Sequence, residues 1–101
     1  MAMTKKQLFN AKNAGLKIEK GMRIEVVNIG SFPDVDKDGH DVTVVALEAA
    51  NGDIYTTISG TIAKSLDLLD EVLGEEGSVV VQVNEAESNN GRQFFTLQIV
   101  D

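Results

Sequence analysis

Apolar and polar residues alternate along parts of the chain, and this two-residue period predicts β-strands. The first run, residues 22–29, alternates over its opening positions, and residues 54–59 alternate again. Residues 42–48 between them are rich in β-branched valine, which favours strands. Asn51-Gly52 separates the second run from the third, and such a pair favours a tight hairpin because both residues tolerate a positive φ. We therefore expect three strands, with a loop at residues 30–41 after the first.

The second half of the chain changes period once and then returns to strands. Leucine and isoleucine recur every three or four positions in residues 61–73, which predicts a helix. Ser59 or Thr61 could cap its start. Two further strand-like runs follow at residues 79–85 and 93–100.

The order of these elements is strand, strand, strand, helix, strand, strand, which is typical of the OB fold. We therefore predict a mainly β protein, a small OB-like five-stranded Greek-key barrel with one helix between strands 3 and 4. Residues 1–20 show no strong period, so we expect a basic, loosely ordered N-terminal segment ahead of a barrel domain at residues 21–101. Single-stranded nucleic acid is a frequent ligand of such barrels, although a fold alone does not establish a function.

The alternation also assigns the aromatic residues to faces of the barrel. Phe95 shares a face with Leu97, so we expect it in the core. Phe94 falls on the opposite, more polar face, and Tyr55 likewise lies opposite its isoleucine neighbours. Rings on polar faces can stack on bases, at about 1–3 kcal/mol for each base. Each ring could instead cover one end of the barrel or pack beneath the N-terminal segment.

Charge is divided unevenly along the chain, whose net charge is -7 at pH 7. Residues 1–23 hold six bases and one acid, whereas residues 24–101 hold three bases and fifteen acids. One basic face could therefore attract phosphate while the rest of the surface repels it, although a solvated basic tail without a ligand would give the same division. The candidate phosphate contacts are the cations that lead into the first strand and the one that ends the last hairpin: Lys12, Lys17, Lys20, Arg23 and Arg92.

The sequence offers little that could catalyse a reaction. It has no cysteine, which excludes disulfides, thiolate metal sites and cysteine catalysis. His40 is the single histidine, so no site that needs two can form. The run DVDKDG from Asp34 copies the first half of an EF-hand calcium loop, but its twelfth position is Val45, inside a predicted strand. We therefore expect an acidic connecting loop, no metal, no cofactor and no enzyme activity.

Four stretches are informative by their order and spacing: FNA from Phe9, AANGDIYTTIS from Ala49, DLLD from Asp67 and FFTLQ from Phe94. In these stretches the chain resembles the single-stranded-DNA-binding proteins of the small Bacillus phages that replicate linear genomes by protein priming. The resemblance implies cooperative, sequence-independent coating of displaced strands during phage DNA replication, without a cofactor. Replication proteins such as a DNA polymerase could be further partners.

Members of that family contact DNA partly through tyrosines, and only Tyr55 carries over, so Phe9, Phe32 or Phe94 could take the missing roles.

No apolar run approaches the roughly 18 residues that span a membrane, and the polar start lacks the apolar core of a signal peptide. We therefore expect the protein to be located in the cytoplasm of the infected host cell. The alternative function is an acidic OB-like protein-interaction module, either an adaptor or a mimic of DNA.

Overall fold

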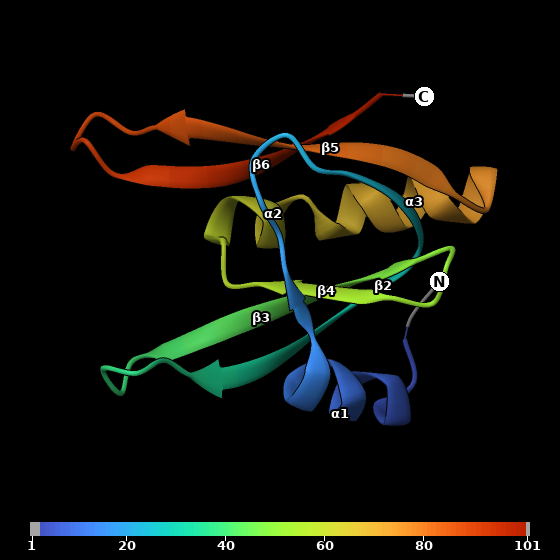
Figure 1. Ribbon diagram of the computed structural model, residues 1–101, viewed down its shortest axis with the longest axis horizontal. Helices are drawn as coiled ribbons and strands as arrows, with labels where there is room; N and C mark the ends of the chain where they lie inside the picture. Colours follow the sequence, from blue (N-terminus) through green and yellow to red (C-terminus); the bar gives the residue numbers. More distant parts are fainter. Residues whose placement is uncertain (1–2, 101) are drawn as a thin grey trace.

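The computed structural model describes residues 3–100. Its strands form one six-stranded sheet in the order β1-β4-β3-β2-β5-β6, which curls into an open barrel (Figure 1). The predicted OB-like architecture is confirmed, with the addition of the short strand β1. The elements are α1 (Lys5–Ala14), β1 (Leu16–Lys17), β2 (Arg23–Val35), β3 (Asp41–Ala49), β4 (Ile54–Thr57), α2 (Gly60–Lys64), α3 (Leu66–Glu76), β5 (Val79–Glu87) and β6 (Gln93–Ile99). Within residues 3–100, no helix is long and apolar enough to cross a membrane.

Strand β2 is longer than the sequence predicted. The prediction of a loop at residues 30–41 was wrong. Residues 30–35 continue β2 and pair with β3 as far as Val35↔Asp41. Strand β5 pairs only with residues 23–26 of β2. A bulge between Val26 and Asn28 then lets β2 leave β5 and continue along β3.

Proline suggested a loop, yet Pro33 fits within β2 because of the direction in which its backbone faces. The Ile29 carbonyl accepts a hydrogen bond from the Met3 N–H, so the backbone N–H and C=O groups of Ile29 point away from β3. Pro33 lies four residues further along the strand, so its backbone nitrogen and carbonyl group point away from β3 as well. No strand pairs with that edge of β2 at Pro33, so the N–H that proline lacks would have no acceptor there. Strands tolerate proline at such unpaired edges.

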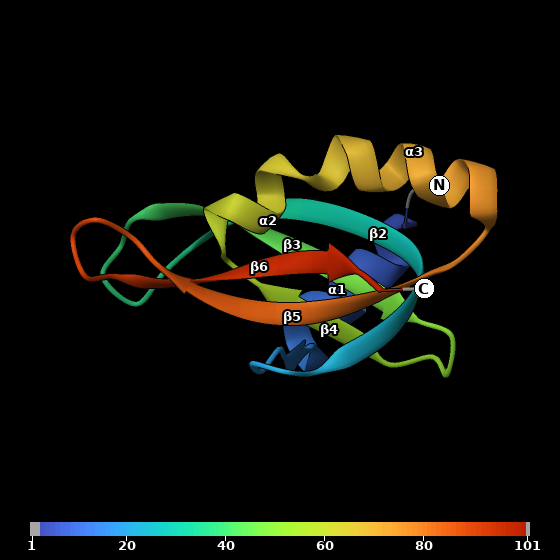
Figure 2. The same ribbon diagram turned by 90° about the horizontal axis from the view of Figure 1, so that it is seen from above.

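Two hydrophobic clusters lie on opposite faces of the sheet. The main cluster fills the inside of the barrel and includes the fully buried Leu47, Ile62, Leu73 and Val81. Helix α3 closes this inner side (Figure 2). The second cluster lies on the outer face, where α1 packs over Ala46 of β3. The central strands are therefore covered on both faces.

Residues that were expected to be loosely ordered form helix α1 and strand β1. Helix α1 begins with a capping box, in which Thr4 and Gln7 each bond the other's backbone N–H. It passes close over β2, where a β-carbon at Gly30 would lie 2.8 Å from Leu8 Cδ2. This close approach explains a glycine inside a strand. The division of the chain into an N-terminal segment, residues 1–20, and a barrel domain, residues 21–101, stays a prediction.

The helix predicted at residues 61–73 is divided in two. Ser59, one of the two expected caps, accepts a hydrogen bond from the Ile62 N–H and starts α2. The chain kinks at Ser65, whose hydroxyl donates to the Thr61 carbonyl, and α3 then runs to its C-cap at Gly77. Gly77 has a φ of 78°, which suits glycine.

Two hairpins extend beyond the barrel in the same direction (Figure 1). We call residues 30–46, at the end of β2 and β3, the first arm. We call residues 84–96, at the end of β5 and β6, the second arm. In Figure 1 the two tips stand apart on the same side of the molecule, and residues of both arms line one groove.

Candidate nucleic-acid interface

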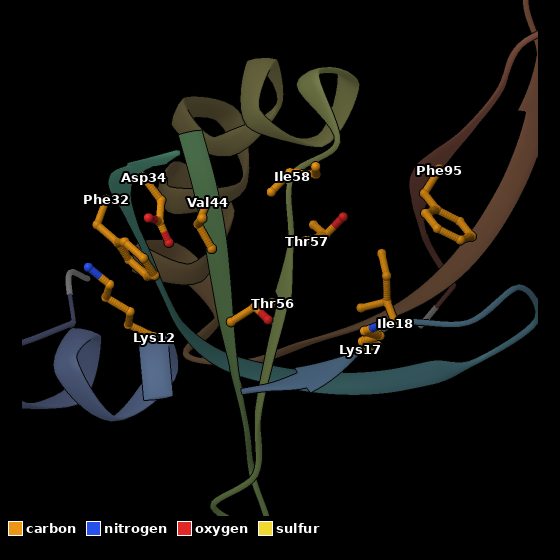
Figure 3. A pocket seen from close by; sticks show the side chains of 10 residues that line it. All are labelled: Lys12, Lys17, Ile18, Phe32, Asp34, Val44, Thr56, Thr57, Ile58 and Phe95. Atoms are coloured by element: carbon orange, nitrogen blue, oxygen red, sulfur yellow. The ribbon is translucent and has the colours of Figure 1, made fainter. Parts of the chain in front are cut away.

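A groove of about 390 Å³ lies between the two arms (Figure 3). Its walls come from both arms, and its floor comes from β3 and β4. The volume falls within the range of roughly 300–1,000 Å³ that is usual for small-molecule sites. The lining residues that matter for binding are Lys12, Lys17, Phe32, Asp34, Thr56 and Phe95.

Two aromatic rings stand on opposite walls of the groove. Phe32 belongs to the first arm, and its inner side packs against the cluster beneath α1. Phe95 belongs to the second arm, and it packs against the main cluster. Both side chains are only partly buried. Packing therefore fixes each ring while part of it stays open to the groove, as a stacking platform requires.

Two lysines lie on the rim below these rings (Figure 3). Lys12 is in the last turn of α1, and Lys17 is in β1; both are exposed. Strand β1 runs parallel to β4, with Lys17 beside Thr56. Gly15 makes this turn possible, because a β-carbon there would lie 2.5 Å from the Ala11 carbonyl oxygen and 2.5 Å from Thr56 Cγ2.

One carboxylate also lines the groove. Asp34 is partly buried, and its Oδ1 accepts a hydrogen bond of 2.8 Å from the Val35 N–H. This bond holds the side chain beside Phe32, two residues earlier on the same face of β2. A fixed negative charge opposes phosphate, so the phosphate path is expected to follow the two lysines on the rim rather than this wall.

One side-chain hydrogen bond joins the end of β4 to β6 beside the groove. The Ser59 hydroxyl, just after β4, donates a 2.9 Å hydrogen bond to the Phe95 carbonyl in β6. The same oxygen accepts the Ile62 N–H at the start of α2. Ser59 therefore fixes the distance between the groove floor and the wall that carries the Phe95 ring.

Tyr55 does not lie in this groove, and the face that the alternation assigned to it was wrong. Its ring packs against the main cluster inside the barrel, whereas Ile54 packs beneath α1. The assignment failed because α1 gives the outer face of β4 an apolar cover that alternation within β4 cannot reveal. Tyr55 lines a separate hollow of about 210 Å³ together with Arg23.

Arg23 is engaged in a chain of polar contacts on the outer face of β2, β5 and β6. Its Nε donates a 3.1 Å hydrogen bond to Gln82 Oε1. Gln82 in turn donates to Asn84, and Asn84 donates to Gln98. These bonds orient the guanidinium along the sheet, away from the groove that the lysines border.

The remaining predicted residues also lie outside the groove. Phe95 packs against the core as expected, and Phe94 therefore points to the other face of β6, where it pairs with Ala86. Arg92 is exposed at the tip of the second arm. Lys20 is exposed in the turn before β2, and Phe9 is exposed on α1.

The groove thus brings together two predicted cations with Phe32, which was named as a replacement for a missing tyrosine, and Phe95, which was expected only in the core. The alternation predicted that Phe95 lies in the core, and for that reason Phe95 was not chosen as a stacking residue. A residue at the rim of a barrel can do both, since one side of its ring packs while the other stays open. The useful signal was the position of Phe95 close to the turn of the last hairpin, where the core ends.

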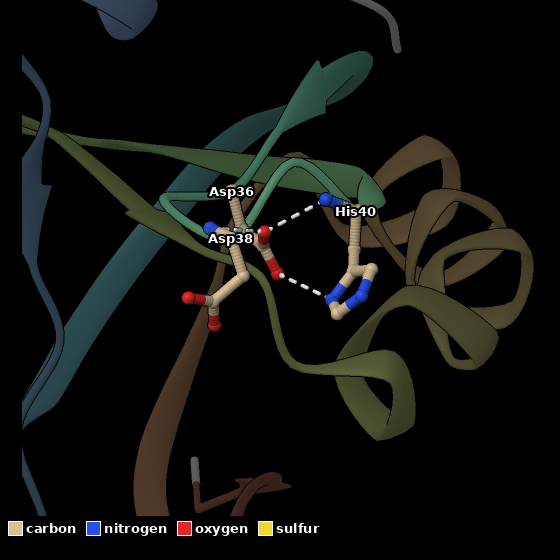
Figure 4. A group of neighbouring side chains, drawn as sticks. All are labelled: Asp36, Asp38 and His40. Carbon is tan, nitrogen blue, oxygen red and sulfur yellow. Dashed lines mark hydrogen bonds and ion pairs between the residues drawn. The ribbon is translucent and has the colours of Figure 1, made fainter.

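The acidic run in the first arm forms a tight turn (Figure 4). Asp36 Oδ1 accepts the N–H groups of Asp38 and His40, each at 2.9 Å, and Asp36 Oδ2 lies 3.7 Å from His40 Nδ1. The predicted acidic connection therefore exists, but it is shorter than expected. Asp36 acts there as a turn-closing acceptor.

Comparisons with known proteins give a consistent result over nearly the whole chain. Residues 2–100 match the model of a family described as phage single-stranded DNA-binding protein. The single-stranded DNA-binding protein of Bacillus phage B103 is 32% identical, over 93% of this chain and 84% of that protein. The proteins of that name from phages PZA and phi29 are each 31% identical, over 92% of this chain and 82% of theirs. No solved structure matches the chain significantly.

Proposed function

This chain belongs to the family of phage single-stranded DNA-binding proteins, and we propose that it binds single-stranded DNA in the groove between its two arms. The observation that carries the proposal is the presence of two partly open rings and two exposed lysines around one groove. Rings take the flat faces of bases, and ammonium groups neutralise phosphates. The two kinds of contact together distinguish a DNA strand from a simple polyanion.

In the proposed complex the backbone follows the rim at Lys12 and Lys17. The bases turn inward and stack on Phe32 and Phe95. Every base has a π-face, so stacking tolerates any sequence. A duplex keeps its bases stacked on one another, and its base faces therefore cannot reach the two rings. Binding is accordingly selective for single strands and independent of sequence.

Five of the predicted DNA contacts outside the groove remain proposals, and Phe9 on α1 is not among them. Arg92 at the tip of the second arm and Lys20 before β2 are exposed, so either could hold phosphates of a strand that leaves the groove. Tyr55 and Arg23 border a second hollow, which a strand could reach only by following the barrel further. Phe94 would contribute from the outer face of β6.

The proposed role is to coat strands that are displaced during phage DNA replication, in the cytoplasm of the infected host cell. Coating requires binding alone, so we propose a protein without enzyme activity. Contacts with replication proteins such as a DNA polymerase would accompany that role.

The test is fluorescence anisotropy of a labelled oligo(dT), titrated with protein at several salt concentrations and compared with duplex DNA. Lys12→Ala and Lys17→Ala should each lower the salt slope by about 0.7, the value for one lost contact on a single strand. Lys64→Ala is the matched control, since Lys64 is exposed on α2 and does not line the groove. Unchanged slopes for both groove variants would place the strand elsewhere.

A second pair of variants tests the rings. Phe32→Leu and Phe95→Leu keep an apolar side chain for each cluster but remove the stacking surface, so each should weaken binding by about 1–3 kcal/mol. Thermal unfolding checks that both variants remain folded. If the unmodified protein does not bind single strands even at low salt, the protein-interaction module becomes the better explanation.

A further inference from the structure

Helix α1 carries an exposed aromatic residue that the DNA groove does not use. Phe9 is 69% exposed and lines a shallow hollow with Lys5, Lys6 and Asn10. The two lysines precede Phe9 by four and three residues, so all three side chains share one side of the helix. Aromatic residues are enriched in protein–protein interfaces, and lysines beside a ring can be matched by a partner surface of opposite charge.

Helix α3 carries the counterpart. Leu68 is 67% exposed, and Glu71 and Glu75 follow it at three and seven residues on the same side of the helix. Helix α3 contains five acids and no base; Lys64, in α2, is the nearest cation along the chain. Its outward side is therefore an exposed leucine bordered by carboxylates.

The two surfaces cannot meet within one molecule. Helix α1 packs on the outer face of the sheet, and α3 packs against the main cluster on the inner face. Figure 1 shows α1 beneath strands β3 and β4 and α3 above them. A contact between the two surfaces therefore joins different copies of the chain.

The two surfaces are complementary in charge and in spacing. If the helices run antiparallel with Phe9 facing Leu68, the N-terminal side of α1 lies against the C-terminal side of α3. Lys5 lies about 6 Å along the axis from Phe9, and Glu71 lies about 4.5 Å from Leu68, at roughly 1.5 Å per residue. The two lysines thus come opposite the carboxylates of α3 while the two apolar side chains touch.

We propose that α1 of one copy docks on α3 of the next copy along a DNA strand. The contact is heterologous, with different surfaces on the two partners, and such contacts build open chains rather than closed pairs. An open chain suits a partner that is itself linear. This inference rests on the proposed single-strand binding, and it identifies the surface through which neighbouring copies cooperate.

The first experiment compares two lengths of oligo(dT), one that holds a single copy and one that holds many. Phe9→Ala and Leu68→Ala should each lower the cooperativity on the long strand by about tenfold, the effect of losing one central contact of an interface. Affinity for the short strand should stay within about twofold of the unmodified protein. Ile99→Ala is the control, because Ile99 is also an exposed apolar residue but has no place in the proposed contact.

The second experiment exchanges the charges. One variant combines Lys5→Glu with Lys6→Glu, and the other combines Glu71→Lys with Glu75→Lys. Each variant alone places like charges in the contact and should lose cooperativity. An equal mixture restores opposite charges at every contact between alternating copies, so cooperativity on the long strand should return. A merely structural role of these exposed residues would not give rescue by mixing.

The outcomes separate this inference from the proposed function. Unchanged cooperativity in Phe9→Ala and Leu68→Ala, or no rescue in the mixture, overturns the contact between copies. A fall in short-strand affinity with Phe9→Ala also overturns it, because Phe9 would then bind DNA directly. If the unmodified protein binds neither strand, the proposed function fails; sedimentation of the mixture without DNA still tests the contact, which requires larger species than either variant forms alone.

Discussion

Replacing Gly15 by alanine tests how tightly the turn between α1 and β1 is held against β4. The φ of Gly15 is -65°, so any residue can adopt its backbone conformation. The constraint is space. The added carbon would lie 2.5 Å from the Ala11 carbonyl oxygen and 2.5 Å from Thr56 Cγ2, whereas ordinary contact begins at 3.4 Å. The carbonyl belongs to the backbone of α1 and cannot rotate away, so the helix end must move from β4.

Forcing extra atoms into a packed site of this kind costs about 1–3 kcal/mol. For a domain of this size, a loss of about 2 kcal/mol lowers the Tm by roughly 8–16 °C. Lys12 and Lys17 stand on either side of Gly15, so a displaced turn should also weaken DNA binding. Thermal unfolding measured by circular dichroism gives the first effect, and anisotropy with short oligo(dT) gives the second.

The matched control is Gly74→Ala. Gly74 lies in α3, and nothing stands within 4 Å of the position its β-carbon would take. Alanine is the better helix former by about 1 kcal/mol, so this variant should match or exceed the unmodified Tm. A Gly15→Ala variant whose Tm and affinity equal those of the unmodified protein would refute the close contact between α1 and β4.

Three further substitutions test other parts of the site. Asp34→Asn removes the one groove carboxylate but keeps an acceptor for the Val35 N–H, so affinity for oligo(dT) should rise about two- to fivefold by anisotropy; an unchanged affinity would show that this charge does not act on a bound strand, against binding in the groove. Ser59→Ala loses both the cap of α2 and the bond to the Phe95 carbonyl, so urea unfolding should show a loss of about 1–2 kcal/mol, and a midpoint like that of the unmodified protein would contradict this role. Tyr55→Phe keeps the ring in the core, so stability and binding should both persist, whereas weaker oligo(dT) binding would reveal a contact made by the hydroxyl group.

The strands could be predicted from the sequence because alternation is a local property. Each strand turns successive side chains to opposite faces, and the hairpin at Asn51-Gly52 needs only the residues beside it. The length of β2 could not be predicted in this way. Pro33 reads as a loop residue unless one knows that its edge of the strand has no partner, and that depends on where β5 ends.

The same limit applies to the candidate site. Charge along the chain pointed to Lys12 and Lys17, because their position in a basic segment is visible in the sequence. The face of Tyr55 depended on which side of the barrel is covered. Helix α1 covers the outer face of β3 and β4 from a distant part of the chain, so no pattern within β4 could reveal it. Phe95 was correctly predicted to pack on the core, but the groove beside it is formed with residues far away in the sequence.

Beyond Val26, one edge of β2 has no partner strand within residues 3–100, and this edge has a consequence for the proposed array of copies along DNA. Edges of this kind are templates for pairing with a strand of another molecule, which leads to aggregation. Here the Ile29 N–H donates to Asn28 Oδ1 at 3.0 Å, the Val35 N–H donates to Asp34 Oδ1 at 2.8 Å, and Pro33 between them has no N–H. With these three donors occupied or missing, the edge offers a neighbouring strand fewer hydrogen bonds than a regular edge strand does. In the proposed array along a DNA strand, copies would therefore lie close together without pairing their strands.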